Sequence, residues 1–141
     1  MGSVFAGALV TRALQAEGVT HIFGLLGHEL LAIYDSCIDA GITIIGTRNE
    51  TAAAEMADAY ARVTGKPGVF MVCAGPGHAN ATLGLAMASF ANSPIIAISA
   101  HSDWSNRDRL PLQEMDQVGM VRPISKWARV VTAPEDEGEQ Y

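Results

Sequence analysis

The chain has 141 residues, which by length is one domain able to bury most of its apolar surface. Hydrophobic residues make up 49% of it and charged residues 17%, so little of the chain can remain solvated. The net charge of −6, without a basic cluster, excludes a nucleic-acid-binding surface. No apolar run approaches the roughly 20 residues that span a bilayer, and no basic segment with a cleavage site opens the chain. We therefore expect a cytoplasmic protein without nucleic-acid or membrane partners.

Short apolar runs alternate with helical patterns through the first hundred residues. Helices are expected from residue 5 up to a stop at Gly18, over residues 28–40 and 79–91, and over the alanine-rich segment between Glu50 and Gly65. Strands are expected at 21–25, 42–46, 68–75 and 94–99. The strands are continuously apolar, as is typical of strands covered on both faces. Such alternation indicates a mostly parallel sheet with right-handed crossovers. The pattern predicts an α/β fold with a doubly wound sheet and helices on both faces.

The remaining third of the chain has mixed polarity and no sustained period. Residues 100–126 are expected to form a loop with a turn or two of helix, followed by a strand at 127–131. We assign residues 1–132 to one domain. The acidic residues 133–141 are either a frayed terminus or the start of an interdomain linker, and we favour the linker.

The cysteines and histidines give no sign of a metal site. Cys37 and Cys73 fit neither a disulfide framework nor a metal-binding pair, so buried free thiols are expected. The four histidines lack ligand spacing such as HExxH. We predict no metal bound by this chain alone.

Three glycine-rich or polar loops follow the first three expected strands. They are GLLGHE at residues 24–29, RNE at 48–50 and AGPGHAN at 74–80. Ligands of open α/β sheets bind outside the carboxyl ends of the strands, and glycines let the backbone approach a ligand closely. Neither GxGxxG nor GxxxxGK[ST] is present, so dinucleotide and P-loop sites are disfavoured.

Glu50 lies on the face of the alanine-rich helix that should be buried. On a helical wheel it falls within about 60° of Ala53, Ala54, Ala57 and Ala61. An acid in the first helical turn is favoured by the helix dipole, and Asn49 or Thr47 could supply the cap. Two readings of Glu50 therefore stay open, a helix N-terminus alone or a functional carboxylate.

The loops, in this order, resemble the N-terminal, pyrimidine-binding domain of thiamine diphosphate enzymes of the acetolactate synthase-like group. That family shows FGxPG, RHEQAAxxMADGYAR, SGPGxxN, DSPxxxITG and FQExD–G–PITK segments. The counterparts here are FGLLG at 23–27, RNETAA through MADAYAR at 48–62, AGPGHAN at 74–80, NSP through SA at 92–100, and LQEMD through PISK at 112–126. The resemblance covers nearly the whole chain.

The resemblance implies a cofactor site at these loops. In the family the glutamate of RHE, here Glu50, hydrogen-bonds a ring nitrogen of the aminopyrimidine and favours the imino tautomer that starts the chemistry. A carboxyl group in an apolar setting holds its proton more readily, which suits this role. Besides Glu50 as the catalytic residue, the cofactor-binding positions are Gly24, Gly27, Gly75, Pro76, Gly77 and Asn80.

Some positions depart from the family or face its substrate. Asn49 replaces the usual histidine beside Glu50, and Leu26 stands where the family has proline. His28, Gln113 and Lys126 match positions on the substrate side in relatives. An exposed helix-start histidine, a loop amide and a solvated lysine are the alternatives for these three.

The chain lacks the GDG…N motif by which the family binds Mg²⁺ and the diphosphate through a second domain. The resemblance therefore implies half of a site, completed by a diphosphate-binding domain or chain and a second copy of this chain, with FAD as an optional cofactor. The implied reaction is decarboxylation of a small 2-oxo acid, with or without carboligation, and the isolated chain should be inactive. Alternatives are a subunit of a two-chain decarboxylase of the sulfopyruvate or phosphonopyruvate type, or a non-catalytic α/β interaction module.

Overall fold

The computed structural model describes residues 6–102, 106, 109 and 111–131. Its elements in chain order are α1 (Ala6–Ala16), β1 (His21–Gly24), the 3-10 turn η1 (His28–Leu30), α2 (Leu31–Asp39), β2 (Thr43–Gly46), α3 (Glu50–Thr64), β3 (Gly68–Val72), α4 (Pro76–Phe90), β4 (Ile95–Ser99), α5 (Gln117–Val121) and the 3-10 turn η3 (Arg122–Ile124). The expected alternation of helices and strands is confirmed.

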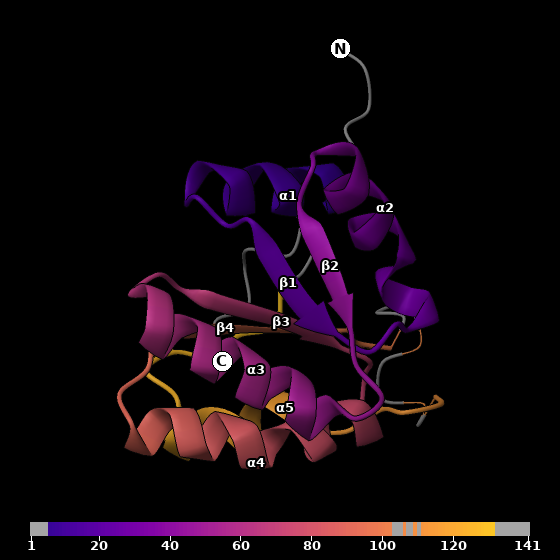
Figure 1. The fold of residues 1–141 in the computed structure, drawn as a ribbon. Coiled ribbons are helices and arrows are strands. Elements are labelled where there is room, and N and C mark those ends of the chain that lie inside the picture. The colour runs from indigo at the N-terminus through magenta and orange to yellow at the C-terminus, as the bar shows by residue number, and fades with distance from the viewer. Residues whose placement is uncertain (1–5, 103–105, 107–108, 110, 132–141) are drawn as a thin grey trace.

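The four strands form one parallel sheet in the order β2-β1-β3-β4. Helices α1 and α2 cover one face of the sheet, and α3 and α4 cover the other, with α5 beside α4 (Figure 1). The chain winds from β1 to β2 through α2 and returns through α3 on the opposite face to reach β3. The doubly wound fold is therefore confirmed, and its direction of winding reverses between β1 and β3.

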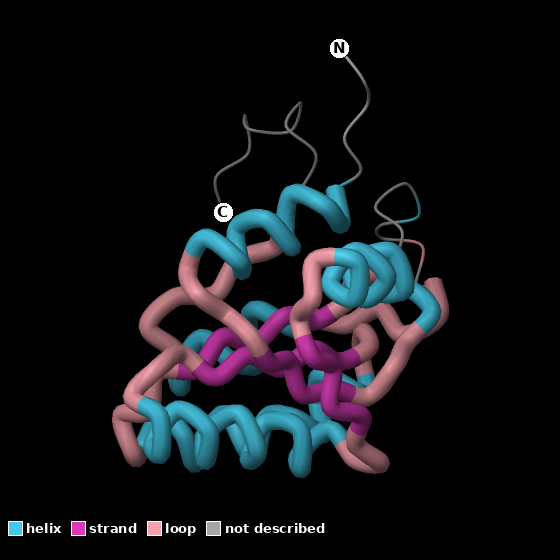
Figure 2. Tube along the Cα trace, turned by 45° about the horizontal axis from the view of Figure 1, so that its top comes forward, coloured by secondary structure: helices cyan, strands magenta, loops and turns pink. Residues whose placement is uncertain are grey.

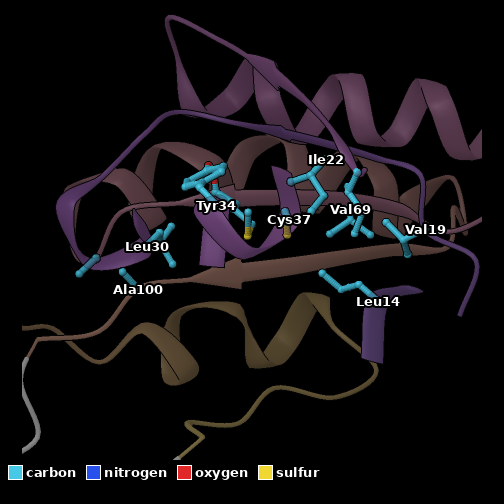
Figure 3. Packing of buried hydrophobic residues seen from close by; sticks show 11 residues of the cluster. Leu14, Val19, Ile22, Leu30, Tyr34, Cys37, Val69 and Ala100 are labelled. Carbon is cyan, nitrogen blue, oxygen red and sulfur yellow. The ribbon is translucent and has the colours of Figure 1, made fainter. Parts of the chain in front are cut away.

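Alternate residues of the central strands supply the two halves of the core. Ile22, Val69 and Met71 point to the side of α1 and α2, where they join Leu14, Tyr34 and Cys37 (Figure 3). Phe23, Phe70 and Val72 point to the other side and pack against Ala53, Ala54, Ala57 and Ala81. Figure 2 shows the strands enclosed between the two helix layers. Small alanines on α3 let that helix lie close to the sheet.

Residues with special backbone preferences set the ends of α3 and α4. Asn49 caps α3, since its side chain accepts hydrogen bonds from the N–H groups of Thr51 and Ala52 at 2.8 and 3.3 Å. Gly65 ends the helix with a φ of 70°, in the left-handed region that glycine adopts without strain. Pro76 opens α4, where its missing N–H and fixed φ are favourable.

Three details of the sequence prediction are wrong. Helix α4 begins at Pro76 rather than at residue 79, because a proline is well placed in a first helical turn, and β3 ends at Val72 rather than at residue 75. Residues 127–131 form no strand; Trp127 and Val131 are 69% and 86% exposed, and no described strand pairs with this segment. The terminus assigned to residues 133–141 lies outside the described residues. Within the described part, none of the helices has the length and apolar character needed to cross a membrane.

Candidate functional site

The carboxyl ends of β1 and β3 meet at the point where the winding of the sheet reverses. Open α/β sheets bind their ligands at such a switch point. The GLLG loop leaves the sheet after Gly24, the GPG loop leaves it after Val72, and α3 starts nearby after β2. The expectation that the three loops share one edge is confirmed by the contacts between them.

Glu50 is the first residue of α3, and only 9% of it is exposed. Its helix is already capped by Asn49, so the carboxylate of Glu50 has no capping bond to make. The four alanines that follow on the same face of α3 are each at most 2% exposed: Ala53, Ala54, Ala57 and Ala61. The expected cap by Asn49 and the expected inward direction of Glu50 are both confirmed, and the functional role of the carboxylate stays a prediction.

Asn80 fixes the orientation of the Glu50 carboxylate. Its Nδ2 donates a hydrogen bond of 3.0 Å to Glu50 Oε2, which joins the first turn of α3 to the second turn of α4. A second link runs from Thr51 Oγ1 to the carbonyl oxygen of Asn80 at 2.6 Å. Among the described residues no donor is bonded to Oε1 of Glu50. This oxygen therefore has capacity for a bond to a ligand.

Gly77 keeps the space beside Glu50 open. A Cβ added at Gly77 would lie 3.3 Å from Glu50 Oε1 and 3.1 Å from Cys73 Cβ, which is closer than ordinary contact. On the opposite loop Gly27 lets the chain pass close to Cys73, because a Cβ there would overlap Cys73 Sγ and lie 3.1 Å from Glu29 Oε2. Any larger side chain at either glycine would occupy the edge where the two loops converge.

Cys73 lies between the two loops and is only partly buried, so the expected burial holds for Cys37 only. Burial raises the pKa of the Cys73 thiol, and the negative charges of Glu29 and Glu50 raise it further. The thiol consequently stays protonated and is a poor nucleophile at neutral pH. It packs the crevice between the loops as a neutral group.

Gly24 is required by the approach of Tyr34 from α2. A Cβ at Gly24 would overlap Tyr34 Oη and lie 2.5 Å from the carbonyl oxygen of Met71. The Tyr34 hydroxyl donates a 3.3 Å hydrogen bond to that carbonyl, so it joins α2 to the carboxyl end of β3. Burial, and then the charges of Cys73 and Cys37, raise the pKa of Tyr34 to about 12. Tyr34 therefore acts as a hydrogen-bond donor at this edge, not as an acid.

The GPG loop is held from its other side by the segment that precedes α5. Gly75 has a φ of 56°, and a Cβ at this position would overlap the carbonyl oxygen of Gln113. Gln113 itself has a φ of 68°, an uncommon conformation for a residue with a side chain. The structure therefore brings Gln113 to the GPG loop through its backbone.

The remaining predicted site residues, His28, Pro76 and Lys126, are all exposed. His28 begins η1 directly after Gly27 and is exposed, and Pro76 is an exposed helix start. Lys126 follows η3, is exposed, and has no hydrogen bond or ion pair to the three loops within the described ranges. The described residues include no group of three His, Cys, Asp or Glu side chains that could hold a metal ion.

Sequence reasoning missed four residues of the edge: Glu29, Tyr34, Cys73 and Gln117. Cys73 and Glu29 flank the loops that the glycines marked, so their position next to these motifs was a usable signal. Tyr34 and Gln117 reach the edge from α2 and α5, and nothing in the spacing of the chain indicates it.

A shallow apolar hollow of about 360 Å³ lies elsewhere, at the last turns of α3. It is lined by Phe23, Met56, Ala59, Tyr60, Val63 and Thr64. The lining of this hollow includes no carboxylate and none of the three loops.

Comparison with known proteins gives a consistent family. The family described as thiamine pyrophosphate enzyme, N-terminal TPP binding domain, matches residues 5–120. The catabolic acetolactate synthase of Raoultella terrigena is 39% identical over 127 residues, which is 90% of this chain and 23% of that protein. The acetolactate synthase of Bacillus subtilis is 38% identical over 85% of this chain and 21% of its own length. The acetolactate synthase large subunit of Buchnera aphidicola subsp. Acyrthosiphon pisum is 42% identical over 94% of this chain and 24% of its own length. The chain thus spans about a quarter of these relatives.

Proposed function

Because the chain belongs to the thiamine pyrophosphate enzymes, as their N-terminal TPP-binding domain, we propose that it supplies the aminopyrimidine half of the site in an acetolactate synthase-like enzyme. The enzyme would decarboxylate a small 2-oxo acid, with or without transfer of the remaining fragment to an acceptor. The observation that carries this proposal is the carboxylate of Glu50, buried at the ligand edge and bonded to Asn80 rather than to its own helix.

The residues of the edge fit this cofactor. Gly77 leaves open the space beside Glu50 that a Cβ would fill, and Oε1 of Glu50 has capacity for a further hydrogen bond. Bound thiamine diphosphate supplies the carbon nucleophile that attacks the 2-oxo acid. Glu50 would hold or release a proton at Oε1, while Asn80 keeps Oε2 in place and stops the carboxylate from rotating.

The remaining parts of the site come from outside the described residues. Mg²⁺ and the diphosphate would be bound by a diphosphate-binding domain or chain, since no metal-binding cluster is found among the described side chains. The relatives extend about four times as far as the matched region, which supports a further domain on the same polypeptide. We assign no FAD-binding role to the described residues.

The relatives' names favour an acetolactate synthase-like enzyme over a two-chain sulfopyruvate or phosphonopyruvate decarboxylase. A non-catalytic interaction module would have no use for a buried acid at the ligand edge, since burial of an ionisable group costs stability. Glu50 therefore supports the catalytic reading.

We further propose that α4 contacts a second copy of the chain. Helix α4 carries no Asp, Glu, Lys or Arg, and its outward stripe of Leu83, Met87 and Phe90 is 61%, 47% and 88% exposed. A helix that is apolar on all sides is normally buried. The alanines of α3 are buried within the chain, so they are not available for this contact. The name "large subunit" of one relative supports an assembly.

The test of the catalytic role is Glu50→Gln in the full-length enzyme, with Glu55→Gln on the exposed side of α3 as the control. An amide cannot share a proton with the cofactor in the same way, so turnover should fall by about 10²-fold or more. The free energy of unfolding should change by less than about 1 kcal/mol, the size of the helix-dipole contribution. The exchange of the cofactor's thiazolium proton, followed by NMR, should slow in parallel. An unchanged exchange rate in a folded Glu50→Gln protein would refute the role.

The assembly is tested by sedimentation of Phe90→Glu, with Ile38→Glu on the other face of the molecule as the control. Ile38 is 63% exposed on α2, so both substitutions place a charge on an exposed apolar position. A charge inside an interface is costly to desolvate, and Phe90→Glu alone should shift the protein toward the monomer. A wild-type chain that is monomeric at high concentration would contradict the proposed contact.

A further inference from the structure

We infer that Gln117 is a positioning residue of the proposed cofactor edge, because its side-chain amide holds the GPG loop at the start of α4. This inference rests on the proposed function, since it concerns the loop that carries Gly77 and leads to Asn80. Gln117 begins α5, some forty residues after the loop in the chain, and is 8% exposed. Neither the sequence motifs nor the family comparison assigns it a role.

Both ends of the Gln117 amide are bonded to backbone groups at the edge of the sheet. Its Oε1 accepts a 3.0 Å hydrogen bond from the N–H of Gly75, and its Nε2 donates a 2.9 Å bond to the carbonyl oxygen of Ala100. Gly75 and Ala100 are both buried, so water does not replace these bonds freely. The side chain therefore spans from the GPG loop to the end of β4.

The amide takes the place of a peptide group where two strands separate. The ladder between β3 and β4 continues as far as the bond from the N–H of Ala100 to the carbonyl oxygen of Val72, at 3.0 Å. Beyond that point the chain turns away from β4 into the GPG loop. The Gln117 amide inserts there with one donor and one acceptor, which a backbone amide would otherwise provide.

The GPG loop depends on this bond because it has few others. Gly75 is the N-cap residue of α4, yet it has no side chain with which to cap the helix. Its φ of 56° and ψ of −111° are accessible mainly to glycine, and such conformations persist where neighbouring groups fix them. The backbone of Gln113 closes one side of Gly75, and Gln117 binds its N–H. Together they determine where α4 begins.

The position of α4 matters for Glu50 because Asn80 lies in its second turn. Asn80 Nδ2 is the donor that orients Glu50 Oε2, and Gly77 borders Glu50 Oε1. A shift of the first turn of α4 would therefore change both contacts of the carboxylate. Gln117 thus acts on Glu50 through Gly75 and α4, without touching it.

Gln117 can hold the loop because α5 is itself anchored. Asp116 caps α5 through a 2.7 Å bond from the N–H of Gly119, and Met120 Sδ accepts a bond from Thr82 Oγ1 of α4 at 3.4 Å. His78 of α4 also faces the backbone of Gln117, which opposes the lowering of the His78 pKa by burial. These contacts keep the Gln117 side chain at a fixed distance from Gly75.

The test compares three variants of the full-length enzyme. Gln117→Met keeps the size of the side chain and removes both hydrogen bonds. Gln117→Glu can form both bonds only when its carboxyl group is protonated, since the ionised form would face the carbonyl oxygen of Ala100. Gln15→Met is the matched control, because the Gln15 amide also binds a backbone carbonyl, that of Ala40 at 3.0 Å, on the exposed surface of α1.

Two quantities are measured: amide hydrogen exchange of Gly75 by NMR in the cofactor-free protein, and the thiamine diphosphate concentration for half-saturation. Gln117→Met should raise both the exchange rate of the Gly75 amide and the half-saturating concentration of thiamine diphosphate by about tenfold, the scale of one or two lost hydrogen bonds. Gln117→Glu should behave like Gln117→Met at high pH and return toward wild type as the pH falls, since burial favours the protonated carboxyl. The wild-type pH profile, measured alongside, accounts for His78. Gln15→Met should change neither quantity.

Wild-type exchange at Gly75 together with wild-type half-saturation in Gln117→Met would overturn the inference. If Gln117→Met is too unstable to purify, the pH profile of Gln117→Glu decides, and an effect that acidification does not reverse overturns it. Exchange at Gly75 does not depend on the cofactor, so it also separates this inference from the proposed function. Full activity of Glu50→Gln would end the proposed function and leave the Gly75 result standing.

Discussion

Helices α3 and α4 approach each other closely at Gly84, and this approach leads to a quantitative prediction. A Cβ at Gly84 would lie 2.5 Å from Ala54 Cβ and 3.2 Å from the carbonyl oxygen of Thr51. Carbon atoms in contact prefer about 3.5–4.0 Å, so Gly84→Ala requires the helices to separate by about 1 Å. Overpacking of this kind costs about 1–3 kcal/mol, while alanine gains up to about 1 kcal/mol in helix propensity. We expect Gly84→Ala to lower the free energy of unfolding by about 1–2 kcal/mol.

A double-mutant cycle separates the clash from the change in propensity. Ala54→Gly combined with Gly84→Ala moves one methyl group across the interface, so the double variant avoids the clash that Gly84→Ala creates. The coupling between the two substitutions should be favourable by about 1 kcal/mol or more, as is typical of residues in direct contact. Ala59→Gly, on the exposed side of α3, gives the propensity cost of glycine in this helix without the packing change.

Urea unfolding followed by circular dichroism measures these free energies. If Gly84→Ala stabilises the protein and its effect adds to that of Ala54→Gly without coupling, the helices do not approach as closely as this structure shows. In the full-length enzyme the same substitution should also weaken catalysis, because α4 carries Asn80 to Glu50.

Three further predictions concern pH, capping and completeness. Burial lowers the pKa of His78 below its ordinary value of 6.5, so the unfolded chain binds the proton more readily than the folded one. The contribution of His78 to the free energy of unfolding should therefore be complete above about pH 6.5 and should decline as the pH falls below it. A His78→Gln protein with the same decline would show that His78 is not its cause. Asn49→Ala should lower the free energy of unfolding by about 1 kcal/mol, and Asn49→Ser should lower it by much less, because serine can still accept the cap bonds. Thermal unfolding measures both losses, and equal losses would mean that the cap bonds do not stabilise the protein. The isolated 141-residue chain, given thiamine diphosphate, Mg²⁺ and pyruvate, should release no more CO₂ than its Glu50→Ala variant, and steady release above that control would count against a half-site.

The fold was predictable because its periodic signals are local. Continuous apolar runs indicated strands covered on both faces, and the core residues of β1 and β3 do alternate between the two helix layers. The shared position of the three loops followed from the parallel sheet, since parallel strands place their carboxyl ends at one edge. The inward direction of Glu50 followed from its angle to the alanines of α3.

The contacts that complete the edge were not predictable because they depend on tertiary packing. Gln117 reaches Gly75 only because α5 packs on α4, and its position in the sequence carries no periodic or motif signal. The strand expected at residues 127–131 failed for a related reason, since an apolar run becomes a strand only where another strand offers it hydrogen bonds. The burial of Asp58, which is 7% exposed, depends on packing in the same way, because Arg62 one turn later pairs with its carboxylate.

The burial of Glu50 is more informative than its presence in a helix start. An acid that only favoured the dipole of α3 would be as effective on the solvated side of the first turn, where its charge costs nothing to hydrate. Here Asn49 supplies the cap, and Glu50 is enclosed with one oxygen bonded to Asn80 and the other bonded to no described residue. Oε1 of Glu50 is not among the fully buried side-chain atoms that lack a partner, so this oxygen stays accessible and can bond to a ligand at the edge. Glu50 thus departs from the preference of helix-start acids for the solvated side of the helix, and such departures are expected at functional sites. A cofactor with a ring nitrogen at this edge would give the inward carboxyl group its partner.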